Sequence, residues 1–395
     1  MWGTPTVIGM HQKILAEFEK EHPKIHVQLE TSTWPAYWDK LQIQVASKTE
    51  PDVYWMSGAY FVNFARKDAF LNLTDFLKKD SIDFSKYYKH SEVFDFGGKL
   101  FGLPKDLTVG ILYYNINLFD KGGVSYPNET WTWDDLLRAA ESLTKDLDQD
   151  GKIDQWGIGT LQGRIEEHLV PFVCSNGGAI LAENRTHSLI DQPPAIQAVQ
   201  FMVDLVHKYH VSPPAGQVLS VGGDEFATGQ VAMTINTSTF VPEYLKITAF
   251  QWDIAPIPKS SHTRKRVTSF VDLTHVISKN TTHPEKAWEL VKYMQGEKAQ
   301  TILAQMKTLI PSLISVATTI YAAPPPKHMA IIPEAASYSR DLQFTATWME
   351  WTQTLFKAME PAFYGKINAE QACMNAAKAI DAILVRELEQ NKGTN

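Results

Sequence analysis

The 395-residue chain contains only two cysteines, Cys174 and Cys373, and they lie far apart in the sequence. No CxxC pair occurs, which excludes a cysteine-rich zinc site and a thioredoxin-type motif. We expect two buried free thiols, because isolated cysteines usually pack as small apolar residues. A single disulfide between them is the alternative.

Long apolar runs and an excess of basic charge are also absent. No window of about 18 apolar residues occurs, so the sequence predicts no membrane span. The formal net charge is -7, which argues against nucleic acid or an anionic membrane as the main partner. The P-loop, GxGxxG, GxSxG and HExxH motifs are missing, so we expect that the protein is not an enzyme. The alternative is a carbohydrate-active enzyme that uses two carboxylates.

Aromatic residues, by contrast, are abundant. The chain has 11 Trp, 14 Tyr and 19 Phe. Trp is seldom frequent on a plain surface, so the excess suggests flat apolar platforms in addition to core packing. For any single Trp, a place in the core is the alternative.

Helical and strand-like patterns alternate from the start of the chain. Residues 7–21 have roughly helical spacing, 25–30 alternate apolar and polar side chains, 34–45 are helical, and 53–56 form a short apolar run. This alternation predicts an α/β sheet with largely parallel pairing. Ligands of such sheets bind in the loops beyond the carboxyl ends of the strands.

The first residues, Met1-Trp2-Gly3-Thr4-Pro5, read like the end of a strand and the loop that follows it. A secretory signal, with its charged region, apolar region and cleavage site, does not precede them in this sequence. We expect that a signal segment, and part of a first strand, are missing from this sequence. A cytoplasmic location is the alternative.

Five segments resemble a known family in their order and spacing. They are 18–27 (FEKEHPKIHV), 51–58 (PDVYWMSG), 102–119 (with GLPKD, LYYN and LF), 226–236 (FATGQVAMTIN) and 283–288 (HPEKAW). Together they resemble the family 1 extracellular solute-binding proteins of ABC importers, which include maltose-binding protein. The resemblance covers nearly the whole chain.

The resemblance implies a fold of the periplasmic-binding-protein type II, with two α/β lobes, a hinge and a ligand cleft between the lobes. Each lobe is then built from separate stretches of chain. We expect 1–110 plus 271–315 in the first lobe, 111–270 plus 316–395 in the second, and hinge crossings near 109–113, 255–270 and 309–321.

The same resemblance implies an extracytoplasmic substrate-binding subunit, periplasmic or a cell-surface lipoprotein. It would capture a sugar or oligosaccharide and deliver it to the transmembrane permease subunits of an ABC transporter. We expect a monomer that requires no cofactor. The alternative ligands within this fold are glycerol phosphate, polyamine or peptide.

A sugar presents apolar C–H faces and a rim of hydroxyl groups. Aromatic rings pack on the faces, while carboxylates, amides and imidazoles satisfy the hydroxyls. We expect ligand contacts from residues of these types in or near loops that follow strands, in strands near a crossing, and on one late helix. They are Trp34, Trp55, Ser57, Tyr60, Asp106, Gln162, His168, Asn236, Phe240, Asp272, Trp348 and Trp351.

Several of these residues have an alternative role. Trp55 continues an apolar run and fits the core equally well. Asp106 could form a hinge salt bridge, and the buried carboxylate of Asp272 needs a partner of either kind. Trp348 and Trp351 lie three residues apart on one helix face, where core packing is the alternative to a platform.

An acidic loop matches the first nine positions of an EF-hand calcium site. Its candidate ligands are Asp146, Asp148, Asp150, Lys152 through its carbonyl, and Asp154. Position 12, which supplies a bidentate Glu in EF-hands, is Gly157. The loop therefore predicts a calcium site of incomplete coordination, with a solvated turn as the alternative.

Overall fold

The computed structural model describes residues 1–3, 5–88, 94–216 and 224–392. The chain divides into two compact units. Unit 1 comprises Met1–Leu107 and Val271–Ala322, and unit 2 comprises Thr108–Phe270 and Ala323–Asn395. The chain therefore passes between the units three times, after Leu107, after Phe270 and after Ala322. The first passage lies just before the expected crossing range 109–113. The other two lie just after the expected ranges 255–270 and 309–321.

Unit 1 has a sheet with helices on both faces. Strand β1 (Val53–Ser57) pairs antiparallel with the later part of β7 (Thr268–Ile277), and β7 neighbours β4 (Gly102–Asn115), whose first residues pair antiparallel with β8 (Ile310–Pro311). A small hairpin is formed by β2 (Asp95–Phe96) and β3 (Lys99–Leu100).

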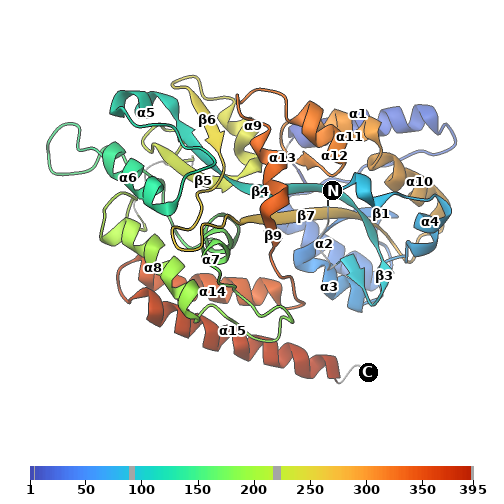
Figure 1. Ribbon diagram of the computed structural model, residues 1–395. Helices are drawn as coiled ribbons and strands as arrows, with labels where there is room; N and C mark the ends of the chain where they lie inside the picture. Colours follow the sequence, from blue (N-terminus) through green and yellow to red (C-terminus); the bar gives the residue numbers. More distant parts are fainter. Residues whose placement is uncertain (4, 89–93, 217–223, 393–395) are drawn as a thin grey trace. The chain divides into compact units, whose positions relative to one another are not determined.

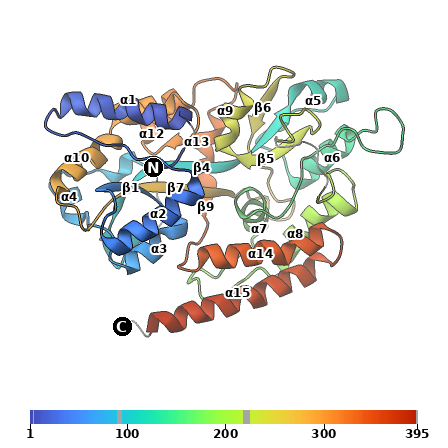
Figure 2. The same cartoon turned by 180° about the vertical axis from the view of Figure 1, so that it is seen from behind.

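The helices of unit 1 bury their apolar faces against this sheet. Figure 1 and Figure 2 place α1 and α11 on one face and α2 and α3 on the other. Side chains of α1, α10 and α11 form one core cluster, which includes Ile14, Leu15 and Met294. The helices are α1 (Pro5–Glu21), α2 (Trp34–Ser47), α3 (Gly58–Arg66), α4 (Thr74–Lys79), η1 (Phe84–Lys86), α10 (Pro284–Met294), α11 (Glu297–Ala304), α12 (Ile314–Val316) and η5 (Ala317–Tyr321).

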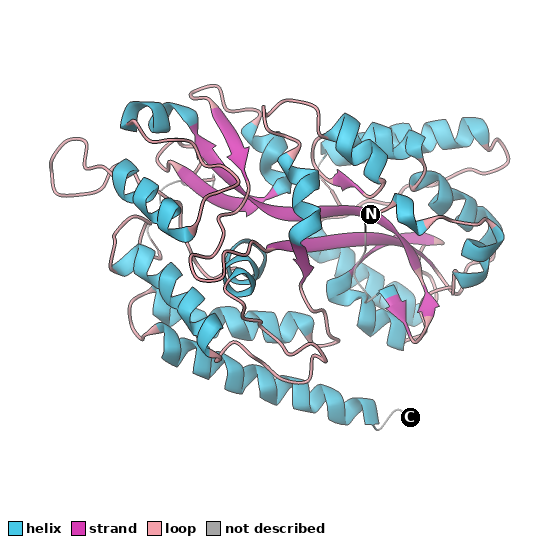
Figure 3. Cartoon of the chain, viewed as in Figure 1, coloured by secondary structure: helices cyan, strands magenta, loops and turns pink. Residues whose placement is uncertain are grey.

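Unit 2 is built around the later part of β4. That strand pairs antiparallel with β5 (Met233–Thr237) and with β6 (Trp252–Ala255), and the first residues of β7 pair in parallel with β9 (Ser339–Asp341). The secondary structure is coloured in Figure 3.

Two long C-terminal helices, α14 and α15, pack against each other and against α8 (Figure 1). The helices of unit 2 are α5 (Ile116–Gly122), α6 (Trp133–Leu143), η3 (Ile165–Leu169), α7 (Val170–Ser175), α8 (Pro193–His207), η4 (Ser238–Phe240), α9 (Val241–Tyr244), α13 (Ile331–Ala335), η6 (Ala336–Tyr338), α14 (Trp348–Phe363) and α15 (Ala369–Lys392).

The expectation of largely parallel pairing is wrong for the described strands. Of the strand pairs with a described register, only β7 with β9 is parallel. The reason is topological: the neighbours of β4 come from distant chain segments that run in the opposite direction. The segment 25–30, which the sequence favoured as a strand, forms no described strand.

Local sequence signals explain where several helices begin and end. Ser57 caps α3, since its hydroxyl accepts from the Ala59 N–H at 3.3 Å. Thr132 and Asp135 form a reciprocal capping box at the start of α6. Gly123 ends α5 in the left-handed region, with φ of 64°. These caps satisfy backbone groups that a helix end leaves without partners.

Cys174 and Cys373 are both free and buried, as expected. Among the described helices, none combines the length and apolar character needed to cross a bilayer.

Candidate functional site

An aromatic cluster of unit 1 surrounds Trp34. The ring of Trp2 lies 4.7 Å from that of Trp34 and 5.0 Å from that of Trp55, both edge to face. Trp38 stacks on Tyr60, with centroids 3.8 Å apart and planes at 10°. We call these five residues the tryptophan cluster. The rings come from α2, β1, α3 and the N-terminal residues. Their mutual contacts fix the orientation of each ring.

Exposure within the tryptophan cluster is uneven. The side chain of Trp34, the first residue of α2, is 41% exposed. Trp55 on β1 is only 5% exposed, so it supports the cluster from within. Trp38 is buried and Tyr60 half-buried. Trp34 is therefore the ring of this cluster that presents the most surface to solvent.

Behind Trp55 lies a buried ion pair. The Lys105 ammonium contacts the Asp106 carboxylate and lies 3.9 Å from the centroid of the Trp55 ring. Both charged groups are almost fully buried. Burial lowers the pKa of Lys105 and raises that of Asp106, while each partner opposes the shift of the other. Asp106 Oδ1 has no hydrogen-bond partner among the described residues.

Asp106 was predicted as a ligand contact, with a salt bridge as the alternative. The structure forms the salt bridge and leaves one carboxylate oxygen for another donor. The two remaining candidates of unit 1, Ser57 and Asp272, are both buried. Ser57 serves as the cap of α3, and Asp272 has a polar or electrostatic partner.

In unit 2, a polar cluster lies at the start of the π-helical turn η3. His168 is buried, and its Nδ1 has no partner among the described residues. Burial, and secondarily Arg164, lowers the pKa of His168 to about 3, so the ring is neutral. Burial, and secondarily Glu167, raises the pKa of Glu166 to about 7. The half-buried Gln162 precedes this turn.

The η3 turn packs against β5, whose carboxyl end carries two further candidates. Asn236 is buried; its Nδ2 donates to the Tyr244 hydroxyl at 3.3 Å, and its Oδ1 accepts from the Thr237 N–H at 2.9 Å. Phe240 is half-buried, with its ring 5.7 Å from that of Tyr244. The carboxyl end of β5 and η3 therefore bring Gln162, His168, Asn236 and Phe240 to neighbouring segments.

The paired tryptophans of α14 have different surroundings. Trp351 is fully buried, and its indole N–H donates to the Thr345 hydroxyl at 3.1 Å. Trp348 is 9% exposed, and its indole N–H has no partner in the part of the chain that the structure describes. This gives Trp351 a core position, whereas Trp348 retains an unsatisfied donor. Ligand contact by either ring stays a prediction.

The acidic loop before Gly157 brings three of its predicted ligands together. Carboxylate oxygens of Asp146, Asp148 and Asp154 lie within 4.8 Å of one another. Asp150 instead pairs with the Lys152 ammonium at 3.1 Å. A Cβ at Gly157 would overlap the backbone of Ala140, which explains why no Glu can occupy position 12. Three carboxylates and no twelfth-position ligand are therefore available to an ion.

The sequence did not identify Trp2 and Trp38 as part of the site. A signal was present for Trp38, since Trp34 and Trp38 are four residues apart on one helix face. No pattern pointed to Trp2, because its neighbours in the cluster come from distant segments. Glu166 was missed because a sequence does not show that a carboxylate is desolvated.

Comparison with known families decides the class. Residues 4–301 match the family model described as bacterial extracellular solute-binding protein. The chain belongs to this family. The solute-binding protein is also similar over most of its length to a binding protein of Brucella abortus (strain 2308), with 25% identity over 386 residues, 94% of this chain and 89% of the relative.

The names of other similar proteins state a ligand. The present chain is 23% identical over 312 residues to the arabinooligosaccharide-binding protein of Bacillus subtilis (strain 168), which covers 74% of this chain and 68% of that one. An ABC substrate-binding protein from Listeria monocytogenes, solved in complex with cycloalternan, matches with a TM-score of 0.84, 25% identity and 97% of each chain. The sugar-binding protein MalE of Xanthomonas citri shares the fold, with a TM-score of 0.83 at 18% identity over 99% of this chain and 98% of that one. The expected type II periplasmic-binding fold is therefore confirmed.

Proposed function

We propose that this solute-binding protein captures a sugar or oligosaccharide outside the cytoplasm and delivers it, as a monomer, to the permease subunits of an ABC transporter. The observation that carries the ligand class is the exposed ring of Trp34, held among three other aromatic side chains. Similarity to the oligosaccharide-binding relatives supports the same class.

The two units would contribute different chemistry. In unit 1 the Trp34 ring would pack on the apolar face of a pyranose, a contact of about 0.5–1.5 kcal/mol by analogy with aromatic pairs. In unit 2 the imidazole of His168 and the carboxyl group of Glu166 have the polarity to bind hydroxyl groups. No step of bond cleavage is part of this proposal, since the family is one of binding proteins.

The test is a thermal-shift and calorimetric screen. Mono-, di- and oligosaccharides are compared with glycerol 3-phosphate, spermidine and a short peptide. A saccharide at about 100 times its dissociation constant should add about 2.7 kcal/mol to the free energy of unfolding. If glycerol 3-phosphate, spermidine or the peptide stabilises the protein and no saccharide does, the proposal of a saccharide ligand is rejected.

We also propose that the acidic loop binds calcium weakly. The three neighbouring carboxylates of Asp146, Asp148 and Asp154 support this, because hard oxygen ligands suit Ca²⁺. The missing ligand at Gly157 favours low affinity. The ion would stabilise the turn and take no part in ligand capture.

A further inference from the structure

Helix α14 of unit 2 begins without a cap from its own N-cap residue. A helix start leaves backbone N–H groups without partners inside the helix, and an N-cap side chain usually accepts from one of them. The N-cap of α14, Thr347, forms no such hydrogen bond with its side chain. Its hydroxyl instead donates to the Glu387 carboxylate at 2.6 Å. The start of α14 is therefore held by a residue forty positions further along the chain.

Glu387 on α15 supplies the acceptors that the helix start lacks. Its two carboxylate oxygens accept from the Ala346 N–H at 3.1 Å and from the Thr347 N–H at 3.0 Å, in addition to the Thr347 hydroxyl. Glu387 is only 8% exposed, so these charge-assisted hydrogen bonds form largely out of water, where they are strongest. A carboxylate also opposes the positive end of the helix dipole. Figure 1 and Figure 2 show α15 running alongside α14.

Trp348, the first residue of α14, directly follows this anchored segment. Its ring packs against two buried rings, with centroid distances of 5.2 Å to Phe344 and 6.3 Å to Trp351. The Trp348 indole N–H is buried and has no partner among the described residues. The anchored backbone and the two neighbouring rings together determine where this unpaired donor points.

We propose that Glu387 is a positioning residue for ligand capture, which fixes the first turn of α14 so that the Trp348 indole N–H donates to an oxygen of the bound saccharide. A buried donor without a partner is unfavourable in the free protein, and an acceptor that arrives with a ligand removes that cost. Such a hydrogen bond requires a narrow geometry, which a fixed backbone preserves. The inference rests on the proposed saccharide function and adds to it a residue that acts through Trp348.

The test is a double-mutant cycle on saccharide affinity. Calorimetric titration with the best saccharide of the screen compares the parent, Glu387→Ala, Trp348→Ala and the double variant. Glu387→Ala should weaken binding about fivefold in the parent and less than about 1.5-fold in the Trp348→Ala background, because residues that act through one contact are not additive. Equal fold-losses in both backgrounds would overturn the proposal, since Glu387 would then affect binding without Trp348.

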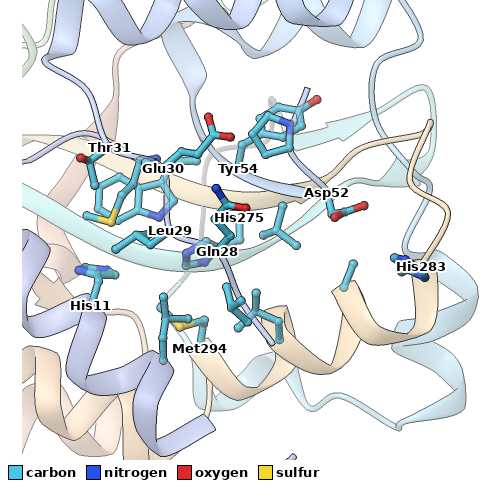
Figure 4. Close-up of a pocket in the computed structure, with 18 of the residues that line it drawn as sticks. His11, Gln28, Leu29, Glu30, Thr31, Asp52, Tyr54, His275, His283 and Met294 are labelled. Carbon is cyan, nitrogen blue, oxygen red and sulfur yellow. Dashed lines mark hydrogen bonds between the residues drawn. The ribbon is translucent and has the colours of Figure 1, made fainter. Parts of the chain in front are cut away.

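Two control variants separate this effect from a loss of stability. Glu389→Gln removes an exposed charge two residues further along α15 and should change neither affinity nor Tm. Met294→Ala shortens a buried side chain beside a cavity of about 440 Å³ in unit 1 (Figure 4), and should lower Tm with no change in affinity. If Met294→Ala weakens binding as much as Glu387→Ala does, the loss reflects stability and the positioning role is rejected.

A spectroscopic measurement tests the position of Trp348 without any ligand. Near-ultraviolet circular dichroism reports on fixed tertiary packing of aromatic rings, and the difference between each protein and its Trp348→Phe counterpart isolates the Trp348 signal. This signal should be at least about twofold smaller in Glu387→Ala and largely retained in Glu387→Gln, whose amide oxygen still accepts. If no saccharide binds the parent, the proposed function fails and this comparison still decides the role of Glu387. An unchanged Trp348 signal in Glu387→Ala would contradict that role.

Discussion

The Lys105 ammonium lies 3.9 Å from the centroid of the Trp55 ring, and the same ammonium pairs with the Asp106 carboxylate. Trp55 and Asp106, which the sequence treats as separate candidates, thus form one buried unit with Lys105 behind the exposed Trp34. Loss of either charge would leave the other without its main compensation.

Lys105→Met should therefore destabilise the protein strongly. A buried pair broken on one side costs about 3–5 kcal/mol, because the remaining charge is desolvated and unpaired. The double variant Lys105→Met with Asp106→Leu should recover most of that loss, since neither charge remains. Urea unfolding at pH 7 measures both free energies. A single variant as stable as the parent would show that the pair contributes nothing.

Trp34→Ala should weaken saccharide binding about tenfold, equivalent to about 1.4 kcal/mol, and leave the fold intact. Trp34→Phe should retain most of the affinity because a flat ring remains. The matched control is Phe356→Ala, since Phe356 on α14 is also exposed, at 39%. Calorimetric titration with the best saccharide of the screen gives each dissociation constant. Equal losses in the two alanine variants would contradict a specific role for Trp34.

The folding stability should depend on pH through His11. This imidazole is buried, and burial, followed by the nearby Lys105, lowers its pKa from 6.5 to about 4. Between these values the unfolded chain binds more protons than the folded one. The contribution of His11 to stability is therefore complete above pH 6.5 and decreases by up to about 3 kcal/mol as the pH falls to 4.

The variant His11→Asn isolates this effect. Its amide can still donate to Val7 O, as His11 Nδ1 does at 2.8 Å, but it does not titrate. The difference in unfolding free energy between parent and variant should shrink as the pH is lowered from 6.5 to 4. A constant difference across that range would exclude His11 as the titrating group. Other groups, such as Glu166, change both proteins equally and cancel.

Calcium should raise Tm of the metal-free protein by a few degrees at millimolar concentration, and EGTA should reverse the shift. Asp146→Asn should abolish the response, because Asp146 is one of the three neighbouring carboxylates. Glu350→Gln, an exposed acidic change on α14, is the control. A response that survives in Asp146→Asn would locate the ion elsewhere.

Much of the fold follows from the sequence. Periodicity alone locates α1, α2 and β1 to within a few residues, because their apolar spacing is regular. The parallel character of the sheet was predicted wrongly, because the strands beside β4 arrive from distant parts of the chain. A sequence pattern records which residues alternate, not which strand lies next to which.

Part of the candidate site could be predicted from the sequence. Residue type and position after a strand identified Trp34 and His168 as candidates. The desolvation of His168, and the burial of the adjacent Lys105 and Asp106 as an ion pair, depend on tertiary packing, which has no local signature. Gly157 is instructive, since a gap in the calcium pattern proved to be a packing requirement against Ala140.

The division of unit 1 between two stretches of chain affects synthesis. Its sheet needs β7 and β8, so residues 1–107 cannot acquire their native partners until Ala322 has emerged from the ribosome. The edge of β1 that pairs with β7 is then open to other nascent chains while unit 2 is still being made. Slow, non-local strand pairing of this kind favours aggregation.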